Sequence, residues 1–380
     1  MFFPVLIVLM TEIYYTNGLN NMQDVPDTST EGNKCMTSDS KPGVCVMYYQ
    51  CNDNNSVNTD GAGIIDIRYG DSCPSMYETC CQVDEQDKSS IQRPEKKISG
   101  CGWRHPNGVG PNRTVNRGEA NFGELPWMIA LLKLIPINPQ DSNSGLMNMY
   151  AGGGSLIHPK VVLTAAHVVT SDDSHYVARA GEWDSQNLDE NYPYQDRNVA
   201  QIVRHEDFNN KNLRNDIALL FLASQMKLAP NVGLACLPPV NFVLNYDSKC
   251  ITSGWGLDQY GKQGRYQNVL KKVELPLVDR SKCQSDLRNT RLGRYFRLDQ
   301  SFVCAGSQKG VDACKGDGGS PLMCSIQTGQ NRYVEVGIVS WGIGCGGDGV
   351  PAAYVNVAMF RDWIDEALRK RGVDNTPYTY

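Results

Sequence analysis

Three short motifs of the sequence carry side chains that could act together in nucleophilic catalysis. They are LTAAH at residues 163–167, NDIALL at residues 215–220 and DACKGDGGSPL at residues 312–322. A hydroxyl is a weak nucleophile unless an imidazole takes its proton, and a buried carboxylate must orient that imidazole and stabilise its charge. The motifs therefore predict His167 as a general base and Asp216 as the carboxylate that orients it.

The order of these motifs resembles that of chymotrypsin-type serine proteases, with histidine first, aspartate second and a Gly-Asp-x-Gly turn last. The flanking segments agree with this resemblance; they read GGSLI at residues 153–157, SGWG at residues 253–256 and SWG at residues 340–342. The resemblance spans residues 114–370 and implies an all-β fold, a two-barrel chymotrypsin-like domain with a C-terminal helix. In such a domain the backbone amides of Gly316 and Gly318 would form an oxyanion hole.

The nucleophile position departs from the family pattern. Residues 316–321 read GDGGSP where the family has Gly-Asp-Ser-Gly-Gly-Pro, so Gly318 stands in place of the serine. Loss of the nucleophile from such a triad costs roughly a millionfold in turnover. Ser320 lies downstream and should sit several ångströms from the imidazole, whereas attack needs about 3 Å. We therefore predict a pseudoprotease; the alternative is an active trypsin-like endopeptidase that uses Ser320.

The activation segment and the specificity pocket depart from the pattern as well. In the family, cleavage frees an N-terminus of the form Ile-Val-Gly-Gly, whose amine pairs with the aspartate before the nucleophile. Asp317 is retained here, but residues 114–117 read TVNR. In the pocket, Asp312 matches the carboxylate that selects Lys or Arg, and Gly342 keeps the wall open. Ala352 adds a methyl group where trypsin-like pockets carry glycine.

Composition and the N-terminus indicate an exported protein. The chain has 380 residues and a formal net charge of -5, which argues against a general nucleic-acid or anionic-membrane binder. Its 14 cysteines predict disulfides and an oxidising compartment. Residues 2–10 form an apolar run too short to span a bilayer, so we interpret residues 1–18 as a signal peptide.

Composition also divides the rest of the chain. We predict a flexible segment (19–34), a cysteine-rich domain (35–81), a linker (82–113), a large domain (114–370) and a tail (371–380). The cysteine-rich block is too small to bury much core, so disulfides must hold it. Many short β-prone runs with turn signals between them predict a barrel or sandwich for the large domain, and an apolar stripe predicts a helix over 359–370.

The cysteine pattern gives a second resemblance. Spacing alone allows 15 pairings of the six N-terminal cysteines, but the block ends in adjacent cysteines and resembles a clip domain. That resemblance implies Cys35–Cys80, Cys45–Cys73 and Cys51–Cys81. The protease resemblance implies Cys101–Cys236, Cys250–Cys324, Cys283–Cys304 and Cys314–Cys345. The family's bridge beside the catalytic histidine is missing, because Gly152 and Val168 occupy its two positions, and we expect lower local stability there.

Clip domain, linker and protease-like domain together resemble an arthropod clip-domain serine protease homologue. Members of that group act without catalysis in the haemolymph, as cofactors of prophenoloxidase activation, the melanisation arm of innate immunity. The resemblance implies prophenoloxidase or its activating clip-domain protease as partners, and cleavage by an upstream trypsin-like protease. Candidate cleavage sites are Arg68, Arg93 and Lys97, and assembly into oligomers after cleavage would suit a cofactor. The alternative is a binding protein that recognises pathogens or acts as a decoy for protease inhibitors.

Two further kinds of site are predicted, although no cofactor is expected for catalysis. Four acidic residues match the calcium loop of trypsin-like proteases: Glu182, Asp184, Asp189 and Glu190. Calcium prefers several oxygen ligands, carboxylates among them. Sequons for N-glycosylation occur at Asn54 and Asn112.

Overall fold

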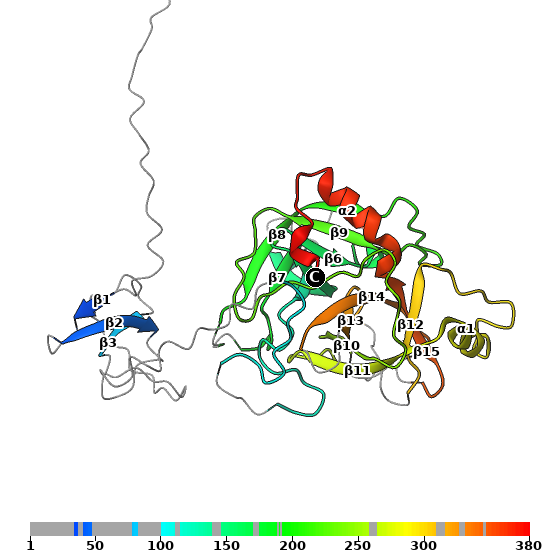
Figure 1. Ribbon diagram of the computed structural model, residues 1–380, viewed down its shortest axis with the longest axis horizontal. Helices are drawn as coiled ribbons and strands as arrows, with labels where there is room; N and C mark the ends of the chain where they lie inside the picture. Colours follow the sequence, from blue (N-terminus) through cyan, green and yellow to red (C-terminus); the bar gives the residue numbers. More distant parts are fainter. Residues whose placement is uncertain are drawn as a thin grey trace, which may run out of the picture. The chain divides into compact units, whose positions relative to one another are not determined.

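The computed structural model describes the chain in two units, residues 1–93 and 94–380, which are considered separately (Figure 1). The described residues are 34–36, 41–47, 78–82, 100–110, 115–138, 146–169, 175–187, 190, 192–257, 264–308, 316–326, 331–344 and 347–380. Among them, no helix is long and apolar enough to cross a membrane.

The first unit contains a small antiparallel sheet. Its strands are β1 (Lys34–Met36), β2 (Pro42–Met47) and β3 (Glu78–Gln82), in that order across the sheet. A disulfide joins the buried Cys35 and Cys80 and so ties β1 to β3. Cys51 and Cys73 lie outside the described residues, so the pairings Cys45–Cys73 and Cys51–Cys81 stay predictions.

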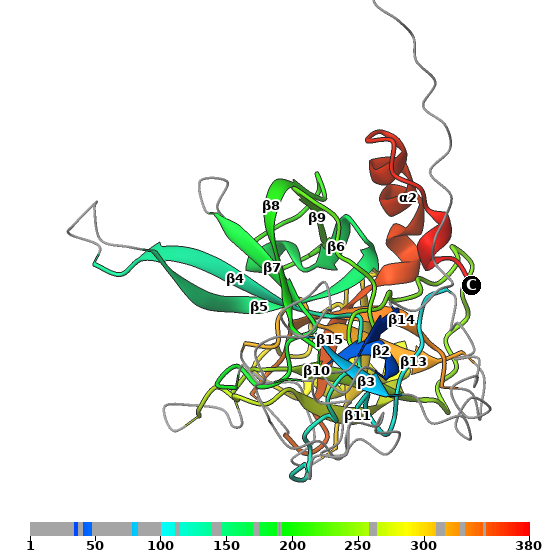
Figure 2. The same ribbon diagram turned by 90° about the vertical axis from the view of Figure 1, so that its left-hand side faces the viewer.

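The second unit consists mainly of two closed six-stranded barrels, which confirms the expected all-β chymotrypsin-like fold. The first barrel has the strand order β4-β5-β6-β9-β8-β7. Its strands are β4 (Met128–Pro136), β5 (Leu146–His158), β6 (Val161–Thr164), β7 (Tyr176–Ala180), β8 (Gln195–Arg204) and β9 (Ala218–Leu222). Figure 2 shows the paired ends of β4 and β5 running out beyond the rest of this barrel.

The second barrel has the strand order β10-β11-β12-β15-β14-β13. Its strands are β10 (Lys249–Gly254), β11 (Lys271–Val278), β12 (Phe302–Gly306), β13 (Pro321–Ser325), β14 (Tyr333–Trp341) and β15 (Pro351–Asn356). Helix α1 (Arg280–Arg288) follows β11. The disulfides Cys101–Cys236, Cys250–Cys324 and Cys283–Cys304 are present, as the resemblance implies. Cys314 and Cys345 lie outside the described residues.

The C-terminal segment packs on the barrels through a helix and a short turn. The apolar stripe lies on α2 (Arg361–Arg369), where Ile364 and Leu368 are fully buried; residues 357–360 form a 3₁₀ turn instead of extending the helix to 359. The expected tail folds back as well, because Tyr378 is fully buried and its carbonyl accepts a hydrogen bond from the Leu237 amide at 2.9 Å.

Candidate functional site

His167 and Asp216 meet where the first barrel faces the second. The buried strand β6 leads into a 3₁₀ turn (Ala166–Val168) that carries His167, and Asp216 lies just before β9. The His167 amide donates to Asp216 Oδ1 at 2.8 Å, and His167 Nδ1 lies 2.7 Å from Asp216 Oδ2. The Asp216 side chain is fully buried, whereas 28% of the His167 side chain is exposed. The pair therefore has the geometry of an imidazole oriented by a buried carboxylate.

A third side chain completes this network. Ser340, in β14, donates its hydroxyl to Asp216 Oδ2 at 2.5 Å. The sequence predicted no role for Ser340 beyond its place in the flanking motif SWG. Because a buried carboxylate needs hydrogen-bond donors, the serine hydroxyl of that motif was the available signal. With Nδ1 bonded to the carboxylate, His167 presents Nε2 toward the cleft.

Gly318 occupies the position that faces His167 Nε2. A Cβ atom placed on Gly318 would lie 2.5 Å from that nitrogen and 3.1 Å from Cε1 of the ring. The surrounding turn is fixed by backbone hydrogen bonds: the Gly153 amide donates to Gly318 O at 2.9 Å, and the Gly319 amide donates to Val339 O at 2.9 Å. The turn therefore presents bare backbone to the imidazole, and the ring occupies space that a side chain would need.

Ser320 does not face the imidazole in this way. It is fully buried, and its hydroxyl packs beside the backbone of Gly153 and Gly254. Its amide donates to Asp317 O at 3.0 Å, which holds it in the turn. A serine enclosed by two strands offers no hydroxyl to a substrate in the cleft.

The carboxylate of Asp317 is bonded to the segment that follows β10 of the second barrel. The Gly256 amide donates to its Oδ1 at 2.9 Å. Burial and the negative charge of Asp317 raise the pKa of Tyr150, which keeps that hydroxyl neutral. Thr114 lies outside the described residues, and the Asn116 amide donates to Glu119 Oε2 at 2.7 Å. The segment that follows Thr114 is thus fastened by contacts of its own.

Other predicted site residues are placed in part. A Cβ atom on Gly342 would lie 3.6 Å from the Ala352 Cβ, so these two residues of the predicted specificity pocket are neighbours. Gly152 and Val168 are likewise neighbours, because a Cβ on Gly152 would lie 2.9 Å from Val168 Cγ1. The following predicted residues lie outside the described part of the chain: Asn54, Arg68, Arg93, Lys97, Asn112, Asp189 and Asp312. The oxyanion-hole role of the Gly316 and Gly318 amides stays a prediction.

The acidic loop after β7 holds carboxylates close to one another. The Asp184 amide donates to Glu190 Oε1 at 2.9 Å, and Arg179 Nη1 donates to Glu182 Oε2 at 3.1 Å. Burial, with the neighbouring negative charges, raises the pKa of Glu190 to about 7. Within the described residues no three His, Cys, Asp or Glu side chains are arranged to hold a metal, and Asp189 is not among them. Calcium binding by the loop stays a prediction.

Two six-stranded barrels with a hydrogen-bond network of His167, Asp216 and Ser340 between them define a chymotrypsin-like serine protease domain. The chain belongs to the trypsin family: residues 114–364 match its family model, described as Trypsin, and residues 32–82 match the model described as Serine protease Clip domain PPAF-2. It is 56% identical over 287 residues to Phenoloxidase-activating factor 2 of Galleria mellonella, covering 75% of this chain and 94% of that protein.

Other relatives carry names that describe them as inactive. The chain is 38% identical to Inactive CLIP domain-containing serine protease A8 of Anopheles gambiae, over 86% of this chain and 88% of that protein. It is 35% identical to Inactive CLIP domain-containing serine protease A28 of the same species, over 86% of this chain and 89% of that protein.

Proposed function

We propose that this protein is a secreted, non-catalytic clip-domain serine protease homologue that acts as a cofactor in prophenoloxidase activation. The observation that carries the proposal is Gly318, which faces Nε2 of the His167 that Asp216 orients. Without a hydroxyl at that position no acyl-enzyme can form, so the cleft can bind a polypeptide but not cut it. The names of the relatives, which include a phenoloxidase-activating factor and inactive clip-domain proteases, support the same role.

In this proposal the protein is itself activated by cleavage. An upstream trypsin-like protease would cut at Arg68, Arg93 or Lys97, and the cut protein would bind prophenoloxidase or its activating clip-domain protease in the haemolymph. Assembly into oligomers would follow the cut. N-terminal sequencing of the cut chain identifies the site.

A paired assay on purified, protease-cleaved protein tests the function. One arm measures labelling by a fluorophosphonate and hydrolysis of an Arg ester, with trypsin as the positive control. The other adds the protein to prophenoloxidase and its activating protease and measures phenoloxidase activity. We expect no labelling, no hydrolysis and a gain in phenoloxidase activity.

Two outcomes would contradict this expectation. Labelling that disappears in Ser320→Ala would identify an active endopeptidase. No effect in either arm would exclude the cofactor role. Binding to microbial polysaccharide would then favour pathogen recognition, and binding to serpin-type inhibitors would favour an inhibitor decoy.

Calcium binding is proposed for the acidic loop. We expect Ca²⁺ at a hundredfold excess over its Kd to stabilise the protein by about 2.7 kcal/mol, measured as a rise in the thermal midpoint relative to EDTA. Because the pKa of Glu190 is raised to about 7, binding should release a proton and tighten as the pH rises from 6 to 8. Glu190→Gln should remove most of the effect, with Mg²⁺ as the control ion. A midpoint that does not respond to Ca²⁺ would refute the site.

A further inference from the structure

The segment from α1 to the start of β12 is strongly basic in an acidic chain. Residues 280–301 contain six basic side chains and two acidic ones, whereas the whole chain has a formal net charge of -5. The basic residues are Arg280, Lys282, Arg288, Arg291, Arg294 and Arg297. Of the two acidic residues, Asp286 pairs with Lys282 at 2.6 Å and so neutralises it, and Asp299 pairs with Arg214, which lies outside the segment. A local excess of positive charge remains on the loop that follows the helix.

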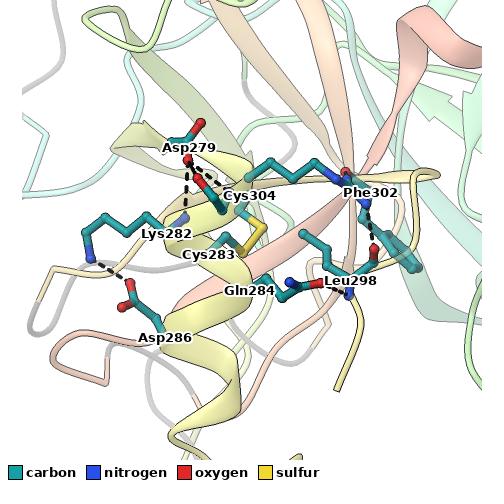
Figure 3. Close-up of a disulfide and its surroundings, with 10 residues drawn as sticks. Asp279, Lys282, Cys283, Gln284, Asp286, Leu298, Phe302 and Cys304 are labelled. Atoms are coloured by element: carbon teal, nitrogen blue, oxygen red, sulfur yellow. Dashed lines mark hydrogen bonds and ion pairs between the residues drawn. A yellow bond between two sulfur atoms is a disulfide. The ribbon is translucent and has the colours of Figure 1, made fainter. Parts of the chain in front are cut away.

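This basic segment is held on a rigid support. Figure 3 shows the Cys283–Cys304 disulfide that joins α1 to β12, with Asp279 at the start of the helix. The Asp279 carboxylate accepts the Ser281 amide at 2.8 Å and caps the helix. On the far side of the loop, the Leu298 amide donates to Gln284 Oε1 at 3.0 Å. Both ends of the loop are therefore fastened to α1.

The loop itself is folded rather than extended. Arg288 Nε donates to Phe296 O at 2.8 Å, and the Phe296 amide donates to Gly293 O at 3.0 Å. The loop thereby presents Arg291, Arg294 and Arg297 to solvent, and no ion pair to these three arginines occurs among the described residues. The folded backbone keeps the three arginines close together on the surface, and each guanidinium can take a carboxylate in a bidentate pair.

The loop also borders the cleft. Phe296 packs edge-on against Trp341 with ring centroids 6.1 Å apart, and Trp341 directly follows the Ser340 that binds Asp216. From the other side of the cleft, Arg214 Nε pairs with Asp299 Oδ2 at 3.1 Å. The segment before Asp216 and the loop after α1 therefore meet beside Trp341.

We propose that Arg291, Arg294 and Arg297, here called the basic rim, dock an acidic polypeptide segment of a partner protein beside the inactive cleft. Charge complementarity selects the occupant: carboxylate side chains match a cluster of exposed arginines, and the adjoining Trp341 and Phe296 offer apolar surface to the same chain. The inference rests on the proposed function in one respect, that the cleft binds polypeptide without cutting it.

Fluorescence anisotropy tests the rim with the full, protease-cleaved chain. The probe is a fluorescein-labelled peptide of alternating Glu and Asp, at physiological salt, and a peptide of Ser and Gly is the neutral control. Arg291→Glu, Arg294→Glu and Arg297→Glu are combined in one variant. We expect its affinity for the acidic peptide to fall at least about tenfold, and wild-type affinity to weaken as salt rises.

A matched variant controls for net charge. Arg117→Glu, Lys160→Glu and Lys227→Glu alter three exposed residues outside the basic rim by the same total charge, and we expect a change of less than about twofold. Equal losses in both triple variants would overturn the proposal, because the attraction would then be non-specific. A thermal melt of each variant establishes that it is folded. The combined Arg→Lys variant should bind with an affinity between those of the wild type and the Arg→Glu variant, because lysine keeps the charge but cannot form the bidentate pair.

Two further results would also overturn it. The first is that the acidic peptide does not bind. The second is that a sulfated heparin fragment binds selectively, because this would identify a glycan site. Either result can coexist with a gain in phenoloxidase activity, so failure of the rim is distinguishable from failure of the cofactor role.

Discussion

Gly318→Ser is expected to remain at least about a hundredfold less active than trypsin on an Arg ester, although it restores the missing hydroxyl. A Cβ at this position would lie 2.5 Å from His167 Nε2, so the imidazole must shift before a side chain fits. Its Nδ1 is held at 2.7 Å by Asp216, which is in turn bonded to Ser340. A misplacement of about 1 Å between reacting groups can cost about a hundredfold in rate.

The activation machinery adds to this deficit. The Asp317 carboxylate accepts the Gly256 amide, and residues 114–117 do not supply the Ile-Val-Gly-Gly start that the family uses to order the site. Active-site titration with a fluorophosphonate and steady-state hydrolysis of the ester measure the outcome. Gly318→Ser with Ser320→Ala serves as the control and should behave like Gly318→Ser alone. Labelling of Gly318→Ser as fast as that of trypsin would show instead that only the nucleophile has been lost.

The parts of the site that sequence could predict are those carried by chemically distinctive side chains. His167 and Asp216 stand in motifs whose residue types fit only a few roles, and the structure brings them to hydrogen-bond distance. Gly318 could be placed because its neighbours Gly316, Asp317 and Gly319 keep the pattern of the turn. In contrast, the role of Ser340 depends on which buried carboxylate its hydroxyl reaches, and that contact joins residues 124 positions apart in the sequence.

The fold, too, has parts that the sequence predicts and parts that depend on tertiary contacts. Alternating β-prone runs predicted an all-β domain, and the family resemblance predicted closed barrels; both are observed. The 3₁₀ turn before α2 and the return of the tail could not be predicted, because both depend on tertiary contacts of ordinary residues. Tyr378 is an example: it lies in the polar stretch TPYTY, yet it is fully buried and donates its hydroxyl to Asp365 at 2.6 Å. The pairings of the clip cysteines depend on the resemblance, since spacing left 15 open.

Glu335 is a buried acid that sequence reasoning missed, because YVEVG reads as an ordinary strand with one outward-facing charge. It lies in β14 of the second barrel, is fully buried, and accepts the hydroxyl of Ser155, in β5 of the first barrel, at 2.5 Å. Its other carboxylate oxygen has no hydrogen-bond partner within the described part of the chain. Burial, only partly offset by the Ser155 hydrogen bond, raises the pKa of Glu335 to about 8.

This raised pKa makes the free energy of unfolding depend on pH. The folded state keeps the Glu335 proton up to about pH 8, whereas the unfolded chain releases it near pH 4.5. The folded state therefore binds more protons between these values, and stability falls as the pH rises through that window. The stabilising contribution is fully present below pH 4.5 and is lost by about pH 8, a decrease on the order of 5 kcal/mol.

Glu335→Gln should remove this dependence, because the amide is neutral at every pH and can still accept the Ser155 hydroxyl. We expect the variant to be several kcal/mol more stable than the wild type at pH 9 and to differ little from it at pH 5. Chemical denaturation of the disulfide-intact protein at both pH values measures the difference. Glu274→Gln, at an exposed position of β11, is the matched control and should leave the wild-type profile unchanged.

Comparing Glu335→Gln with the wild type also assigns the pH dependence of the free energy of unfolding to the contact between the two barrels. Burial also raises the pKa values of Glu182 and Glu190, so the wild-type slope contains their contributions, and only the difference between Glu335→Gln and wild type isolates Glu335. Parallel slopes in the two proteins would contradict the assignment. Because β5 carries both Ser155 and the Gly153 amide that holds Gly318 O at 2.9 Å, ionisation of Glu335 should loosen the support of the turn that faces His167.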